Sequence, residues 1–303
     1  MAKLTLRLVA TLAALSFGPA AHARPAGWST GWTAFEPRPD GRVVLAVSID
    51  GHTTTALLDS GTSESVIDQA YAGLIGLEPH GAYPNNGVSG VATSGHVDGA
   101  RIEVGGLALN GLTLASLNLA EATPPSRPII LGEELFERAV VDIDFARHRI
   151  AFRDPARFAR PRGATEVVLT RDSDLRLIPV SIEGRPPALF EFDLGAGGTI
   201  VLAPAYARET NLLAGRQTSQ GAIYGVGGPE TETRAVLRQI VFAGIGFPDV
   251  DAHFPPTWPS ATFSDRVKGV LGAMILSRFH LIIDYPHDRL YVFPNPDAAT
   301  PAR

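Results

Sequence analysis

Short apolar runs with alternating polar positions recur along the chain, and most of them end at glycine or proline. Examples are residues 43–49, 102–104 and 178–182. Alternation with a period of two over about four to eight residues is typical of strands that are buried on one face. Helical spacing is confined to a few short segments, which are 68–74, 133–137, 204–210 and 273–277. The pattern therefore predicts a mainly β protein.

The order of these elements repeats once along the chain. An aspartate ends an apolar run at Asp59 and again at Asp193, and each is followed downstream by a leucine and a glycine, at residues 131–132 and 271–272. The matching residues occur in the same order in both copies. The number of residues between a residue and its match increases along the chain only through small insertions. Such regular self-similarity indicates an internal duplication. We therefore expect two homologous mainly β units.

The N-terminus has the features of a secretory signal peptide. Lys3 and Arg7 precede an apolar run at 8–17, and small residues suited to cleavage follow at 21–23. A membrane-spanning helix needs about 20 apolar residues, which is longer than this run. We expect cleavage after Ala23, export to the periplasm or secretion, and no stable membrane insertion afterwards.

The break between the two copies falls where proline and arginine interrupt the apolar pattern, near Asp154-Pro155 and Arg160-Pro161. Either unit has the length of an ordinary domain. The expected organisation is a signal peptide at 1–23, an N-terminal segment at 24–37, a first lobe at 38–153, a linker at 154–166, a second lobe at 167–294 and a tail at 295–303.

Composition excludes several classes of function. The chain has no cysteine, which removes disulfides, thiol catalysis and thiolate metal sites. Its formal charge is −5, whereas a nucleic-acid partner would favour a clustered basic surface. The eight histidines form no His-x-x-x-His pair, so we expect no zinc site. Neither a metal nor an organic cofactor is expected, and nucleic acid is not expected as a partner.

The duplicated aspartate suggests a specific chemistry. Two carboxyl groups brought face to face cannot both ionise cheaply, so their pKa values separate and one proton is shared. The ionised member can then take a proton from water while the protonated member hydrogen-bonds a carbonyl oxygen. This arrangement suits the hydrolysis of an amide bond.

The chain resembles the aspartic proteases, in particular a tandem, single-chain, bacterial-type form of the retropepsin-like group. The matching motifs are Leu57-Leu58-Asp59-Ser60-Gly61-Thr62, Ile129-Ile130-Leu131-Gly132 and Val270-Leu271-Gly272. The resemblance covers nearly all of the chain after residue 23. It implies a bilobal acid-protease fold of two retropepsin-like β-barrel halves, endopeptidase activity on a peptide or protein substrate, and Asp59 and Asp193 as the catalytic pair. The residues that would support the pair are Ser60, Gly61, Thr62, Leu194 and Gly195.

Glycine-rich stretches follow each aspartate and resemble the flaps of this family. The residues expected to cover or bind substrate are Val88, Ser89 and Gly90 in the first half, and Tyr224, Gly225, Val226 and Gly227 in the second. Such mobile hairpin tips close over a substrate and exclude water. The alternative is an ordinary hairpin turn, which glycine marks equally well.

The second half departs from the family pattern, which has a serine or threonine directly after each aspartate to bridge the two loops. Ser60 fits this pattern, but Leu194 does not. A catalytically weak or inactive homologue that binds peptides therefore remains an alternative to the active protease. The other prominent acidic residues, Asp142, Asp144 and Asp284, are expected to pair structurally with Arg149 or Arg289.

Overall fold

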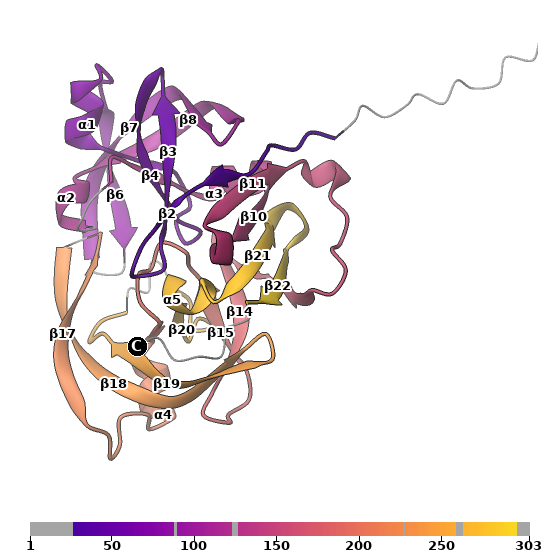
Figure 1. The fold of residues 1–303 in the computed structure, drawn as a ribbon. Helices are drawn as coiled ribbons and strands as arrows, with labels where there is room; N and C mark the ends of the chain where they lie inside the picture. Colours follow the sequence, from indigo (N-terminus) through magenta and orange to yellow (C-terminus); the bar gives the residue numbers. More distant parts are fainter. Residues whose placement is uncertain (1–26, 88–89, 123–126, 227, 259–262, 296–303) are drawn as a thin grey trace, which may run out of the picture.

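The computed structural model describes residues 27–87, 90–122, 127–226, 228–258 and 263–295 (Figure 1). The predicted signal peptide at 1–23 lies outside these ranges. So does the predicted tail at 295–303, apart from Asn295.

The first half of the chain forms an eight-stranded sheet that closes on itself. The strand order is β2-β3-β4-β9-β5-β8-β7-β6, and an additional pairing of β3 with β7 joins six of the strands into a barrel. The strands are β2 (Glu36–Pro37), β3 (Val43–Ile49), β4 (His52–Leu58), β5 (Val66–Asp68), β6 (His80–Gly87), β7 (Gly90–Val104), β8 (Leu107–Leu117) and β9 (Ile129–Leu131).

The second half repeats this topology element for element. Its order is β13-β14-β15-β20-β16-β19-β18-β17, and β14 pairs with β18 to close the ring. The strands are β13 (Thr170–Asp172), β14 (Leu175–Ile182), β15 (Ala188–Phe192), β16 (Ile200–Leu202), β17 (Thr218–Gly225), β18 (Gly228–Phe242), β19 (Ile245–Phe254) and β20 (Gly269–Leu271). The predicted duplication is thus present in the fold.

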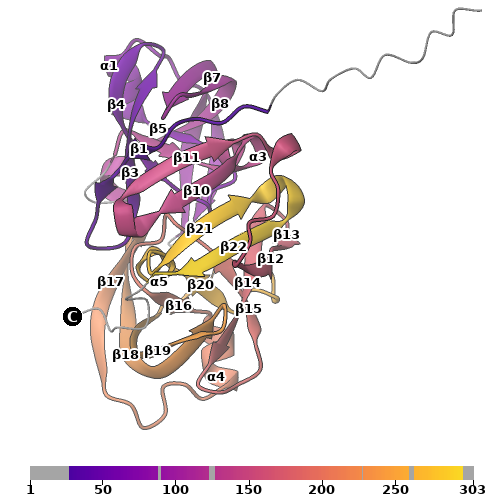
Figure 2. The ribbon, with the colours of Figure 1, turned by 45° about the vertical axis from the view of Figure 1, so that its right-hand side comes forward.

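A third sheet takes strands from both halves and lies beside the two barrels (Figure 2). Antiparallel pairing of β10 with β21 joins the closing segment of the first half to that of the second. The strands, in spatial order, are β1 (Thr33–Ala34), β11 (Arg149–Arg153), β10 (Val140–Asp144), β21 (Phe279–Asp284), β22 (Arg289–Pro294) and β12 (Thr165–Val168).

Helices are few and short, as the apolar spacing predicts. They are α1 (Gln69–Leu74), α2 (Leu119–Ala122), α3 (Glu133–Arg138), α4 (Pro204–Glu209) and α5 (Ala273–Leu276), with 3-10 turns η1 (Phe145–Arg147), η2 (Pro155–Arg157) and η3 (Tyr285–His287). The sequence did not predict α2, which is only one turn long. In the described part of the chain no helix has the length and apolar character needed to cross a membrane.

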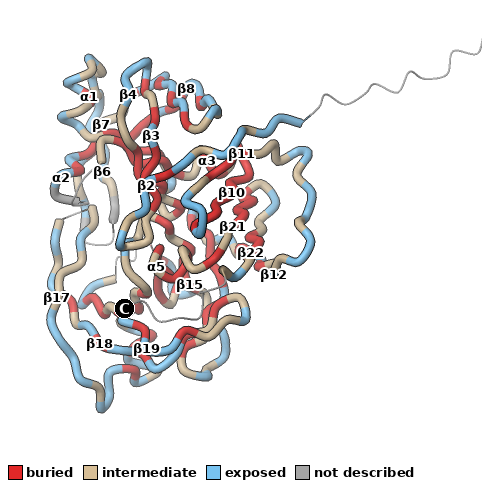
Figure 3. Tube along the Cα trace, viewed as in Figure 1, coloured by how far each residue is buried: buried red, intermediate tan, exposed pale blue. Residues whose placement is uncertain are grey.

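One continuous apolar core runs through both barrels and the shared sheet (Figure 3). It contains inward-facing residues from the strands of both barrels, among them Leu45, Leu58, Ile178 and Phe192. Alternation of buried and exposed positions along β3 places its apolar residues inside. The prediction of a mainly β protein made of two equivalent barrel halves is therefore confirmed.

The predicted charge pairs of the shared sheet are only partly correct. Asp144 lies opposite Arg149 and accepts a hydrogen bond from its Nε at 3.0 Å, as predicted. Asp142 instead pairs with Arg153 at 2.9 Å, because Arg153 is its diagonal neighbour across β10 and β11.

At the second closing turn the predicted pair does not form. The 3-10 turn η3 brings His287 Nδ1 to within 2.8 Å of Asp284 Oδ1. Arg289 instead donates to Glu166 of β12 at 2.9 Å. The orientation of the Arg289 side chain is therefore set by its partner on the neighbouring strand β12.

Candidate active site

Two equivalent loops carry the predicted aspartates at the ends of matching strands. Asp59 follows β4 and Asp193 follows β15, and each preceding strand runs parallel to the later apolar strand, β9 or β20. The N–H of Asp59 donates to Leu131 O at 2.9 Å, and the N–H of Asp193 donates to Leu271 O at 3.3 Å. These bonds place both aspartates by the same backbone geometry.

The two loops approach each other so closely that only glycine fits at the position two residues after each aspartate. A side-chain carbon at Gly61 would lie 2.7 Å from Asp193 Cγ, and one at Gly195 would overlap the Asp59 carboxyl group. Each glycine therefore lies directly against the aspartate of the other loop. The structure brings together Asp59, Gly61, Asp193 and Gly195.

Backbone N–H groups bind both carboxylates, but not equally. Gly61 N–H donates to Asp59 Oδ1 at 2.9 Å. Asp193 Oδ1 accepts two such bonds, from Gly195 N–H at 2.7 Å and Ala196 N–H at 3.0 Å. Hydrogen bonds to an ionised carboxylate favour that form, so the second loop stabilises a negative charge better than the first.

The pKa values of both carboxyl groups reflect this environment. Burial raises the pKa of Asp59 well above its usual range, and the charge and hydrogen-bonding of Asp193 raise it further. Burial also raises the pKa of Asp193, but the N–H groups of Ala196 and Gly195 and the hydrogen bond with Asp59 oppose the rise. The pair is therefore poised to hold one proton above the usual carboxyl range.

A single serine joins the two loops. The buried Ser60 hydroxyl donates to Phe192 O at 2.9 Å and accepts a hydrogen bond from Leu194 N–H at 2.9 Å. Leu194 offers no hydroxyl in return, and its side chain is fully buried in the apolar core. Thr62 stays within its own loop and donates to Glu64 O at 3.1 Å. The bridge between the loops is therefore asymmetric.

Replacing Ser60 by alanine should destabilise the protein by about 2 kcal/mol, because Leu194 N–H and Phe192 O would lose a buried hydrogen-bond partner. Urea unfolding monitored by circular dichroism measures this change. Ser63 is exposed in the same loop, so Ser63→Ala is a matched control with an expected effect within about 0.5 kcal/mol. Equal stability of the two variants would show that the Ser60 bridge does not hold the loops together.

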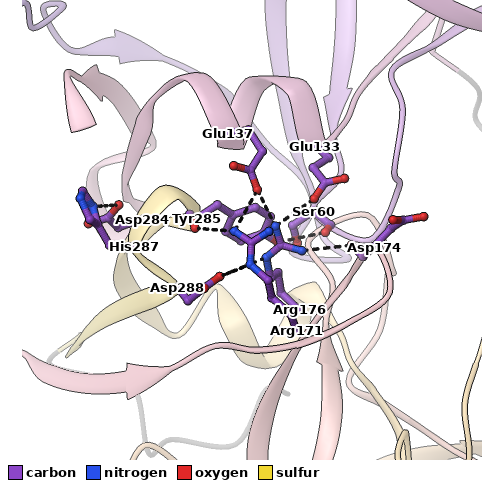
Figure 4. A network of polar contacts seen from close by, with 10 residues as sticks. All are labelled: Ser60, Glu133, Glu137, Arg171, Asp174, Arg176, Asp284, Tyr285, His287 and Asp288. Atoms are coloured by element: carbon purple, nitrogen blue, oxygen red, sulfur yellow. Dashed lines mark hydrogen bonds and ion pairs between the residues drawn. The ribbon is translucent and has the colours of Figure 1, made fainter. Parts of the chain in front are cut away.

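A polar network behind the loops ties the two halves to Ser60 (Figure 4). The Tyr285 hydroxyl donates to Ser60 O at 3.0 Å, and the Arg176 guanidinium lies 4.8 Å from the centre of the Tyr285 ring. Arg176, from β14, is almost fully buried and pairs with Glu133 and Glu137 of α3. Because a buried charge needs partners, these carboxylates hold the arginine at the junction.

The predicted flap residues lie at the ends of two long hairpins. Gly87 pairs with Gly90 at the end of β6 and β7, and Gly225 pairs with Gly228 at the end of β17 and β18. Val88, Ser89 and Gly227 lie outside the described residues.

The second hairpin crosses to the opposite half, where β17 and β18 contact α2 (Figure 1). Val226 packs there against an apolar cluster that includes Leu57 and Ile130. Tyr224 remains half-exposed.

Sequence reasoning missed two charged residues of this site. Glu191 is a buried carboxyl two residues before Asp193, and its signal was a lone charge within the apolar strand Ala188–Phe192. Arg42 lowers the pKa of both aspartates by its positive charge while it donates to Asp40 at 2.9 Å. Nothing in the local pattern around Arg42 indicated this position.

The side chains near the pair do not include an evident metal site. Across the described ranges, no group of three or more histidine, aspartate or glutamate side chains is arranged to hold a metal ion.

Comparison with known proteins agrees with this geometry. A family model described as aspartyl protease matches residues 45–135 and 178–275, which together make up more than half of the chain. Each matched region contains one aspartate of the pair and the later Leu-Gly segment that packs beside it. A search of curated protein sequences found no match.

Proposed function

Because the chain belongs to the aspartyl protease family, we propose that it is an endopeptidase that hydrolyses peptide bonds with a water molecule held between Asp59 and Asp193. The observation that carries the proposal is the approach of two equivalent loops, in which each glycine lies against the opposite carboxyl group. Carboxyl groups so close share one proton instead of ionising together. One member can then act as base and the other as acid.

Hydrogen bonding assigns the two roles. Asp193 accepts two backbone N–H bonds and Asp59 accepts one, which favours an ionised Asp193 and a protonated Asp59. The positive charge of Arg42 stabilises the single negative charge on the pair.

The reaction follows from this assignment. Asp193 takes a proton from water as the water oxygen bonds to the peptide carbonyl carbon, and Asp59 gives its proton to the carbonyl oxygen. The proton on Asp193 then passes to the amide nitrogen as the carbon–nitrogen bond breaks. A hydroxyl of the intermediate returns a proton to Asp59, so the pair ends in its starting state.

The two hairpins would cover a bound peptide. Val91 on β7 and Tyr224 on β17 are exposed apolar residues near the ends of these hairpins. Such side chains can contact an extended peptide and limit the access of water to the reacting bond.

We further propose that residues 1–23 direct export to the periplasm or the exterior. This part of the proposal rests on the sequence features of that segment, which lies outside the described residues.

The proposed activity is tested by incubating the purified protein with a diverse peptide library from acidic to neutral pH. We expect internal cleavage, detected by mass spectrometry. A statine-type peptide should inhibit it, because its hydroxyl occupies the place of the attacking water. A chelator should leave cleavage unchanged, and loss of activity on chelation would contradict the mechanism.

A second candidate is a peptide-binding protein without turnover. The asymmetric bridge favours it, since the bridging hydroxyl comes from Ser60 and Leu194 contributes none. Saturable peptide binding without any cleavage, with both aspartates intact, would support this function over the protease.

A further inference from the structure

Glu191 occupies an unusual position on β15, the strand directly before Asp193. Side chains alternate along a strand, so Glu191 points to the same side as Asp193, the first residue after β15. Glu191 lies opposite Leu177 of β14 and beside Val270 of β20. In the first half the equivalent position is Leu57, which lies opposite Val44 and beside Ile130. A carboxyl group therefore replaces an apolar side chain in otherwise matching surroundings.

This third carboxyl group reaches the aspartate pair. A side-chain carbon at Gly61 would lie 2.9 Å from Glu191 Oε1 and 3.0 Å from Asp193 Oδ1. Both carboxyl groups therefore face the same glycine of the opposite loop, a few ångström from each other. The first half offers nothing comparable beside Asp59, because Leu57 is apolar.

Glu191 lacks a counter-charge. Its residue is only 3% exposed, and among the described residues no hydrogen bond or ion pair reaches its carboxyl group. Arg42, whose positive charge acts on both aspartates, is paired with Asp40. Arg176 is held by Glu133 and Glu137.

The titratable groups that face Glu191 are acidic or neutral. They are Asp193 and Asp59, together with Tyr285 of η3, whose hydroxyl donates to Ser60 O. Burial raises the pKa of Glu191 well above its usual range, and the charges of Asp193 and Asp59 raise it further. An uncompensated buried carboxyl group takes up a proton instead of remaining charged. Glu191 is thus neutral while the pair carries its single negative charge.

We propose that Glu191 is a positioning residue for the Asp59–Asp193 pair and that it supports turnover only while it is protonated. The inference rests on the proposed protease function. Ionised Glu191 would put a second negative charge beside Asp193 in an apolar setting, and repulsion would move the pair. A displacement of about 1 Å can cost roughly 100-fold in rate. The ionisation of Glu191 therefore lowers the alkaline limit of activity, which loss of the Asp59 proton would otherwise set at a higher pH.

The test compares the pH profile of kcat/KM in the wild type and in Glu191→Gln. Glutamine has nearly the same shape but cannot ionise, so the acidic side should stay within about threefold of the wild type. The alkaline midpoint should move up by about one pH unit or more, a tenfold change in proton concentration. Identical profiles would overturn the inference.

Two further variants serve as controls for this test. Glu183→Gln changes another nearly buried carboxyl group, which pairs with Arg216 and Arg238 at the distant turn between β14 and β15. It should leave the profile unchanged. Glu191→Leu copies the residue of the first half and also cannot ionise. It should show the same alkaline shift, and an unshifted alkaline midpoint in a folded Glu191→Leu would count against the inference.

A second measurement does not depend on catalysis. A carboxyl group with a raised pKa in the folded state binds its proton more tightly there than in the unfolded chain, where its pKa is about 4.3. Stability of the wild type should therefore fall as pH rises from that value toward the folded-state pKa. Glu191→Gln lacks this loss, so its advantage in urea midpoint should grow toward neutral pH.

The two measurements separate failure of the inference from failure of the proposed function. A difference in urea midpoint that stays constant with pH would show that Glu191 holds no proton, and it would overturn the inference even if peptides are cleaved. A wild type that cleaves no peptide would overturn the protease function, and with it the positioning role. In that case a growing difference in midpoint would still establish the buried proton.

Discussion

Replacing either aspartate of the pair by asparagine should abolish peptide cleavage and leave the protein folded. Asparagine has nearly the same shape but can neither accept a proton from water nor share one with its partner. We expect kcat/KM to fall roughly a thousandfold in Asp59→Asn and in Asp193→Asn. The double variant should lose little more, because residues that act as a unit are not additive.

The stability of the two asparagine variants should be equal to or higher than that of the wild type. Burial raises the pKa of both carboxyl groups, so the folded state loses stability as pH rises above their unfolded pKa of about 3.9. An asparagine removes that loss, and the melting temperature of each variant at neutral pH should equal or exceed that of the wild type. The exposed Asp249 gives a matched control, since Asp249→Asn should change neither property. Substantial activity in Asp193→Asn would show that the second loop is not catalytic.

Gly195→Ala should abolish the proposed peptide cleavage, because of the space that its methyl group occupies. The added methyl group would overlap the Asp59 carboxyl group, so one loop must shift away from the other. Because a displacement of about 1 Å can cost roughly 100-fold, we expect at least that loss in kcat/KM. Steady-state kinetics at the optimum pH measures it.

The matched control is Gly73→Ala in α1, where an added carbon meets nothing within 4 Å. Its activity should be unchanged. Should Gly195→Ala fail to fold, Gly61→Ala tests the equivalent contact of the other loop, since its carbon would lie 2.7 Å from Asp193 Cγ. Activity within twofold of the wild type in a folded variant would mean that the loops do not need their close approach.

Local patterns in the sequence predicted the elements that are buried on one face. Residues 43–49 form β3 with the predicted bounds, because alternation there reflects the barrel interior. The tip of the hairpin strand β18, from Gly228 to Thr231, has no such alternation, since its residues occupy only intermediate and exposed positions. A segment without a buried face carries no hydrophobic period to read. The single turn of α2 was too short to show one.

The sequence by itself determined the duplication, the β architecture and the placement of Asp59 and Asp193 at the ends of equivalent strands, because repeated local motifs place equivalent residues at equivalent strand ends. Only the tertiary structure decided what surrounds that pair. Ser60 makes two hydrogen bonds to the opposite half, and Glu191 is a buried carboxyl group without a counter-charge. The physical reason is that the partners of Ser60, and the Gly61 that lies against Glu191, come from the opposite half of the molecule, more than a hundred residues away along the chain. Burial and electrostatic balance arise only when the two barrels close on one another.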